Sequence, residues 1–331
     1  MKRASYSILA VAAVAVLAGA AARDAVTLRW LALVVPCAAF ATFVLGMSWR
    51  VIVWSLAPVP FRIPTVCGQQ KALRWIKPDR LESPPGTLAV VGRMALEILL
   101  FRSLFRNTKT ELRKGPRLVF GENKFLWLGA MAFHWSLLMI LVRHLRLFLE
   151  PVPAFVLAAE KLDGFFQVGR PVMYISDGVV VAALLYLFQR RLRDPLVRYI
   201  SLFTDYFALA LLGGIAFSGI WMRYFGRVDI TGVKQFALGL ATFRPVPLPE
   251  SSGSLFVHLI LVSTLAAYFP FSKLVHMGGV FLSPTRNLAN NNRAKRHVNP
   301  WNYSVRVHTY DEWEEEFHDK LEAAGLPLER K

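Results

Sequence analysis

Long apolar runs alternate with polar, mostly basic segments along the whole chain. As an α-helix, about 20 apolar residues span the roughly 30 Å hydrocarbon core of a bilayer. Six runs approach or exceed this length, and we predict a transmembrane helix in each, at residues 6–22, 28–47, 125–149, 171–188, 203–224 and 255–281. The predicted fold is therefore all-α, an integral membrane helical bundle of about six transmembrane helices.

The first run permits two interpretations. Its flanking residues, MKRASYS and AGAAARDA, resemble a secretory signal with small residues at a cleavage site. The second run follows within a few residues, which favours a retained helix. Cleavage would leave five transmembrane helices and would not affect the other assignments.

The composition supports a membrane protein and excludes other classes. Of the 331 residues, 55% are hydrophobic, and the mean hydropathy is +0.40. The net charge of +17 would suit a nucleic-acid-binding protein, but the charges lie in loops between the apolar runs. The only cysteines, Cys37 and Cys67, are too few for a disulfide scaffold or an iron–sulfur cluster, and both are interpreted as structural.

The distribution of basic residues predicts the orientation. Residues 50–124 contain 14 Lys and Arg against 5 Asp and Glu, residues 189–198 are also basic, and residues 282–310 contain five basic residues and no acid. Basic loops stay on the cytoplasmic side of a membrane. All three segments then fall on that side, which predicts a multi-pass membrane protein with a cytoplasmic C-terminus.

Four regions follow from these patterns. Residues 1–55 hold two transmembrane spans, 56–123 a basic cytoplasmic segment, 124–285 a four-helix core, and 286–331 a cytoplasmic tail. Within the basic segment, GTLAVVGRMALEILLFRSLF is interrupted by Arg93, Glu97 and Arg102, so it predicts an amphipathic helix lying in the membrane interface.

Four of the seven histidines lie in two of the predicted spans. His134 and His144 are ten residues apart in the third span, and His258 and His276 are eighteen apart in the sixth. At a rise of about 1.5 Å per residue, these spacings correspond to about 15 Å and 27 Å along a helix. Because the two spans run antiparallel, His134 pairs in depth with His276, and His144 with His258.

Two opposed imidazoles suit a six-coordinate electron-transfer haem. The chain has no C-x-x-C-H motif, so the predicted cofactors are two non-covalent b haems with these four histidines as axial iron ligands. Zinc fits less well, because neither depth offers a convergent carboxylate or thiolate. Two alternatives stay open: core histidines bonded to backbone carbonyls, and a transporter whose His and Arg residues form a proton or anion path.

Other polar residues in the spans fit this interpretation. Arg143, Arg146 and Lys273 are candidates for binding the haem propionates, or they reach out to the interface. Gly213, Gly214, Ser218 and Gly219 would allow close helix packing or admit a flat macrocycle. Pro270 predicts a kink just before His276.

Two stretches carry a family resemblance. FPFSKLVHMGGV at 269–280 closely resembles the last helix of the respiratory nitrate reductase gamma subunit, a dihaem cytochrome b. QRRLRDPLVRYISLFTDYFALALL, which includes Asp205, resembles the loop and helix before it, and the histidine spacings also match. The resemblance covers about residues 120–285.

The tail SPTRNLANNNRAKRHVNPWN resembles a narrower branch, DsrM, the cytochrome b subunit of the Dsr membrane complex of sulfur-metabolising prokaryotes.

The resemblance implies the function. It makes the four histidines the axial ligands, a membrane quinol such as menaquinol the electron donor, and a cytoplasmic iron–sulfur subunit the acceptor. The outer pair, His144 and His258, would then be the entry for electrons, and Arg143 and Asp177 are candidates for the quinone site. Asp177 is alternatively a structural partner of an arginine.

In the tail, Trp313, Phe317 and Leu321 form a stripe suited to docking a partner, or to packing on the chain itself.

Overall fold

The computed structural model describes residues 2–57, 59, 68–115, 117–164, 172–244, 246–249, 253–295 and 307–329. Within these residues, five helices are long and apolar enough to cross a membrane: Lys2–Ala21, Ala25–Leu56, Lys124–Leu147, Phe203–Gly226 and Gly253–Phe271. The prediction of an all-α integral membrane bundle is confirmed, and the chain is a multi-pass membrane protein.

The bundle contains α1 (Lys2–Ala21), α2 (Ala25–Leu56), α5 (Lys124–His144), α7 (Ile175–Arg193), α9 (Phe203–Trp221) and α11 (Gly253–Tyr268). The shorter helices are α3 (Thr87–Leu100), α4 (Arg102–Phe105), α6 (Ala154–Asp163), α8 (Pro195–Ile200), α10 (Ile230–Ala241), α12 (His276–Leu282), α13 (Pro284–Asn287) and α14 (Tyr310–Ala323). Strands β1 (Thr108–Arg113) and β2 (Arg117–Glu122) form an antiparallel hairpin. Helical turns η1 (Leu145–Leu147) and η2 (Met222–Gly226) extend α5 and α9.

Helix α7 corresponds to the predicted span at 171–188, but it starts at Ile175 and continues to Arg193. It is not among the five helices that are long and apolar enough to cross a membrane, because it carries Asp177 in its first turn and three arginines in its last. It packs against both α5 and α9. Its place in the core of the bundle is therefore set by these neighbours.

Two apolar clusters explain how the helices associate. Phe133 of α5 packs with Val180 and Leu184 of α7 and Leu212 of α9. Val11 joins Leu211 and Leu261 in a second cluster, so α1 packs on α9 and α11. The hydroxyl of Ser7, fully buried, donates to the Phe203 carbonyl at 3.0 Å and adds a polar contact between α1 and α9.

The last predicted span is broken, so the expectation of one continuous helix over 255–281 is wrong. Helix α11 ends at Tyr268, two short turns follow (η3, Phe269–Phe271, and η4, Lys273–Val275), and α12 begins at His276. Proline has no amide hydrogen and clashes with the preceding turn, which ends the helix near Pro270. The carbonyl of Pro270 accepts a hydrogen bond from Arg50 Nε of α2 at 2.9 Å.

The basic segment contains the predicted helix as α3. Its charged residues face inward, since Arg93 is only 4% exposed, whereas Leu88 and Val91 are exposed. This arrangement suits the predicted position in the membrane interface, which stays a prediction. The β1–β2 hairpin was not predicted. Its signal in the sequence is Gly115, which forms the turn with a φ of +86°.

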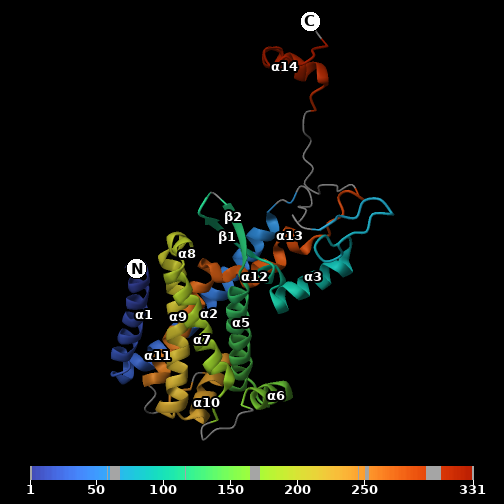
Figure 1. Ribbon diagram of the computed structural model, residues 1–331. Coiled ribbons are helices and arrows are strands. Elements are labelled where there is room, and N and C mark those ends of the chain that lie inside the picture. Colours follow the sequence, from blue (N-terminus) through green and yellow to red (C-terminus); the bar gives the residue numbers. More distant parts are fainter. Residues whose placement is uncertain are drawn as a thin grey trace.

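The segments expected on one side of the membrane lie at one end of the bundle. The β1–β2 hairpin, α3, α8 and α13 gather there, whereas α6 and α10 lie at the opposite end (Figure 1). The C-terminal segment also folds back on the basic segment, because Asn291 Nδ2 donates to the Pro85 carbonyl at 3.0 Å. We call the end with the hairpin the basic end.

Gly129 is a close approach between α5 and α7, and we expect Gly129→Ala to destabilise the bundle. A Cβ at this position would lie 2.5 Å from ring atoms of Tyr186. Overpacking of this kind lowers the free energy of unfolding by about 1–3 kcal/mol. Gly178→Ala adds the same methyl group to α7 where no atom lies within 4 Å. Thermal unfolding in detergent should therefore separate the two variants, and equal melting temperatures would contradict this close contact.

Candidate functional site

His134 and His276 lie side by side near the basic end of the bundle. His134 is halfway along α5, and His276 is the first residue of α12. Their ring centroids are 6.0 Å apart, with the rings 81° to one another. The break after α11 therefore presents His276 directly to the imidazole on α5.

Each of the four histidines of the predicted spans is bound through Nδ1. The Nδ1–H groups of His134, His144 and His276 donate to backbone carbonyls at 2.8, 2.7 and 2.8 Å, respectively. A carbonyl can only accept, so Nδ1 carries the proton and Nε2 keeps its lone pair. Metal-binding histidines show this arrangement, in which the other ring nitrogen holds a backbone or carboxylate partner.

The Nδ1 of His258 also has a hydrogen-bond partner, in this case a side chain of α9. Its Nδ1 lies 2.9 Å from the Ser218 hydroxyl, whose own hydrogen is donated to the Ile215 carbonyl at 3.0 Å. The Ser218 oxygen therefore accepts the Nδ1–H of His258. A Cβ at Gly219 would lie 3.4 Å from this imidazole, so the small residues of α9 let the histidine approach closely.

The histidine pairs suit an ion that needs only two protein ligands. Among the described residues, no group of three or more His, Cys, Asp or Glu side chains could hold a metal ion. Two imidazole nitrogens on opposite sides of one metal, each bonded at about 2.0–2.1 Å, place the ring centroids about 6 Å apart. The observed spacing of His134 and His276 fits this value, and haem iron needs two axial ligands because the porphyrin supplies the rest.

The loop that carries His276 is held by α9. Lys273 Nζ lies 2.8 Å from Asp205 Oδ1, and the Asp205 side chain is only 4% exposed. The carbonyl of the same lysine accepts the Nδ1–H of His276. Lys273 thus links the buried carboxylate to the orientation of the imidazole.

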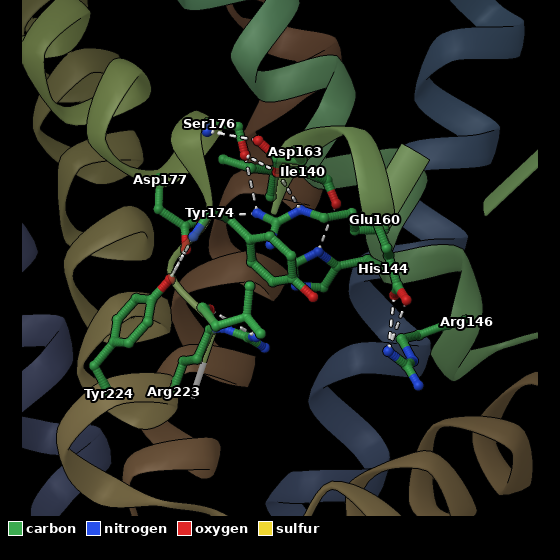
Figure 2. A network of polar contacts seen from close by, with 12 residues as sticks. Ile140, His144, Arg146, Glu160, Asp163, Tyr174, Ser176, Asp177, Arg223 and Tyr224 are labelled. Carbon is green, nitrogen blue, oxygen red and sulfur yellow. Dashed lines mark hydrogen bonds and ion pairs between the residues drawn. The ribbon is translucent and has the colours of Figure 1, made fainter. Parts of the chain in front are cut away.

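A buried ion-pair network lies next to His144 at the opposite end (Figure 2). Arg143 binds Asp163 of α6 through Nε at 3.0 Å and Asp177 of α7 through Nη2 at 2.6 Å. Its guanidinium also stacks on Tyr174, with 3.7 Å between Cζ and the ring centroid. Asp177 accepts a second hydrogen bond, from the Tyr224 hydroxyl, at 2.8 Å. This geometry matches the alternative role of Asp177 as a structural partner of an arginine.

The other two candidate cations for haem propionates also have acidic partners. Arg146 donates through Nη1 to both carboxylate oxygens of Glu160 at 2.9 Å, and Lys273 binds Asp205. Propionate binding by Arg143, Arg146 and Lys273 stays a prediction. Sequence patterns did not indicate Asp163, Glu160, Tyr174 or Tyr224. These residues lie in other segments than the four histidines and share no motif with them.

The aromatic stripe of the tail and the two cysteines have simple outcomes. Helix α14 contains the predicted aromatic stripe, with the rings of Trp313 and Phe317 5.9 Å apart. Cys37 is exposed in α2. Cys67 lies outside the described residues.

Removal of Arg143 should cost far more stability than removal of Arg146. Arg143→Gln leaves two carboxylates without their cation, and the Asp163 side chain is only 3% exposed. Breaking a buried pair on one side typically lowers the free energy of unfolding by about 3–5 kcal/mol. Arg146 is 43% exposed, so Arg146→Gln should cost about 0–1 kcal/mol. Similar melting temperatures for both variants in detergent would show that the Arg143 network contributes little.

Comparisons with known proteins identify the family of the chain. The model of the family described as "Nitrate reductase gamma subunit" matches residues 91–295. A relative from Archaeoglobus fulgidus, an "Hdr-like menaquinol oxidoreductase cytochrome b-like subunit", is 46% identical over 275 residues, 81% of this chain and 82% of that protein. A protein of the same name from Archaeoglobus profundus is 40% identical over 274 residues, 80% of this chain and 81% of its own length. The chain thus belongs to the nitrate reductase gamma subunit family.

Proposed function

We propose that the protein is a dihaem cytochrome b that transfers electrons between membrane quinol and a cytoplasmic iron–sulfur subunit of a redox complex. The observation that carries this proposal is the set of four intramembrane histidines, each held through Nδ1 with Nε2 left for a metal. The names of the two Archaeoglobus relatives, cytochrome b-like subunits of a menaquinol oxidoreductase, support menaquinol as the quinol.

The chain's own residues form the two sites. His134 and His276 would hold one b haem near the basic end, and His144 and His258 the other. When bound, the haems supply one-electron transfer. The protein would supply the histidine ligands, their orientation and the surrounding electrostatic field. Asp205 acts on the first site through Lys273, and Ser218 acts on the second through His258.

The basic end is proposed to face the cytoplasm. Lys and Arg concentrate there, which favours that side of a prokaryotic inner membrane, and the C-terminus would lie on it. The iron–sulfur subunit would then dock at the basic segment and tail, where α14 offers its aromatic stripe. The tail resemblance to DsrM adds the proposal that the complex serves sulfur metabolism.

Quinol oxidation is proposed at the opposite end, beside His144 and His258. Oxidation of a quinol releases two electrons and two protons, so the site needs a proton acceptor. The Asp177 carboxylate lies near His144 within the Arg143 network, with its Oδ2 bonded to Tyr224. Arg143 would orient Asp177. The carboxylate would accept one of the two quinol protons at Oδ2, and the second would pass to water at the outer face. Electrons would move inward while protons leave outside, so turnover would separate charge across the membrane.

We expect two b haems per chain, and the pairing can be tested by variants. His134→Ala/His276→Ala should lose one haem and keep the other, because both changes fall on one pair. His134→Ala/His144→Ala should lose both, because each change removes a ligand from a different pair. The measurement is a pyridine haemochrome assay on purified protein. Full haem content in all four single variants would refute the ligand assignment, and colourless wild-type protein would favour a transporter.

The proposed quinol site predicts a slow reduction step in Asp177→Asn. General-base catalysis typically contributes about 10²–10⁴-fold, so menaquinol should reduce the haems at least about 100-fold more slowly. Glu160→Gln is the matched control, because Glu160 is an acidic residue of the same region that pairs with Arg146 instead. Quinone-site inhibitors should shift the spectrum of the haem lost in His144→Ala. If they shift only the haem lost in His134→Ala, quinol is oxidised at the basic end and this orientation is wrong.

A further inference from the structure

A bulky residue in an unusual backbone conformation lies at the corner between α3 and α4. Phe101 has φ +48° and ψ +47°, the left-handed region that residues with a Cβ rarely adopt. It ends α3 and starts α4, so its backbone turns the chain sharply between the two helices. Such conformations persist only where the surrounding structure holds them, and they gather at functional sites.

Two tryptophans of α5 hold this corner. Trp127 Nε1 donates to the Leu100 carbonyl at 2.7 Å, and Trp135 Nε1 donates to the Leu99 carbonyl at 3.1 Å. The last carbonyls of a helix have no partner within the helix itself. The two indoles therefore cap the C-terminus of α3 and fasten it to the helix that carries His134.

The capped corner places the Phe101 ring against an imidazole. The centroids of the Phe101 and His134 rings are 4.9 Å apart, with the rings at 74°. Phe133 contacts the same imidazole, at 5.0 Å and 79°. His134 thus has two aromatic rings edge-on beside it, and His276 lies 6.0 Å away.

The corner is also tied to the helix that carries His276. Glu97 of α3 accepts a hydrogen bond from the backbone of Ser103 at 3.1 Å, which closes the corner. Glu97 also binds Arg286 of α13 at 2.6 Å. Because α13 begins two residues after α12 ends, this ion pair connects the corner to the chain of His276. The corner therefore bridges the two elements that present the paired histidines.

We propose that the α3–α4 corner, residues 97–105, is a lid on the His134/His276 site, and that Phe101 excludes water from the haem bound there. This inference rests on the proposed dihaem function. Water stabilises the more positively charged ferric state, so an apolar shield raises the reduction potential of a haem. Phe101 is a positioning residue in this scheme, because it touches the ligand His134 rather than the iron.

The test is a redox titration of Phe101→Gly and Phe101→Leu in the purified full-length protein. Glycine adopts the left-handed conformation readily, so Phe101→Gly removes the ring without straining the backbone. Its His134/His276 haem should become about tenfold harder to reduce, a fall of about 59 mV for one electron. The haem on His144 and His258 should not change. Phe101→Leu retains apolar bulk and should restore most of the potential.

Phe120→Ala is the control, because Phe120 is an aromatic residue of the same basic segment that is exposed on β2 and lies outside the α3–α4 corner. It should leave both potentials unchanged. If Phe101→Gly does not assemble, Trp135→Phe removes only one indole cap and should lower the same potential by a smaller amount. Unchanged potentials in Phe101→Gly with both haems present would overturn the lid, as would an equal fall in Phe101→Leu. Wild-type protein without b haem would refute the proposed function instead.

Discussion

Hydrocarbon offers no hydrogen bonds, and an imidazole has two nitrogen atoms that need them. A polar group without a partner costs about 2–7 kcal/mol in apolar surroundings, so both nitrogens of a histidine in contact with hydrocarbon need a partner. The structure supplies one partner for each ring, always at Nδ1: three backbone carbonyls and the Ser218 hydroxyl. Nε2 is the atom through which a metal between paired imidazoles would be bound.

The same constraint governs the charged residues near the histidines. A lone cation in a bundle is expensive, and Arg143, Arg146 and Lys273 each bind a carboxylate. At one end, Arg143 joins Asp163 of α6 to Asp177 of α7, next to His144. At the other, Lys273 binds Asp205 and orients His276 through its own carbonyl. At both ends an ion pair fastens a neighbouring element to a histidine.

The break in the last span shows how an irregular backbone is tolerated in a membrane protein. Non-helical residues at membrane depth need protein groups to satisfy their backbone. Arg50 of α2 binds the Pro270 carbonyl, and Ser272 accepts a hydrogen bond from the Leu274 amide at 3.2 Å. The result is a short, anchored link that starts a new helix at His276. The α3–α4 corner covers the same region from the basic segment.

The sequence alone determined the transmembrane helices, apart from the break in the last one, and it predicted the pairing of the histidines. Apolar runs of bilayer length specify transmembrane helices without reference to the rest of the chain, because hydrocarbon thickness sets their length. The spacing of the histidines in α5 and the spacing of His258 and His276 predicted which histidines lie at the same depth. The charged interruptions of an apolar run predicted the helix found at α3. These features depend on local pattern and on the bilayer, so they can be read from a linear sequence.

Only the tertiary structure decided which groups surround the histidines. Ser218 and Phe101 contact a histidine directly, and Asp163 acts through Arg143. All three come from segments far from these histidines in the sequence, and none lies in a motif that would indicate its partner. The break at Pro270 was expected only as a kink, because its extent depends on Arg50 in another helix. Side-chain partners across helices depend on the rotation and depth of each helix, which packing sets. The sequence therefore specified the candidate ligands, and the fold specified which side chains hold them, cover them and form ion pairs beside them.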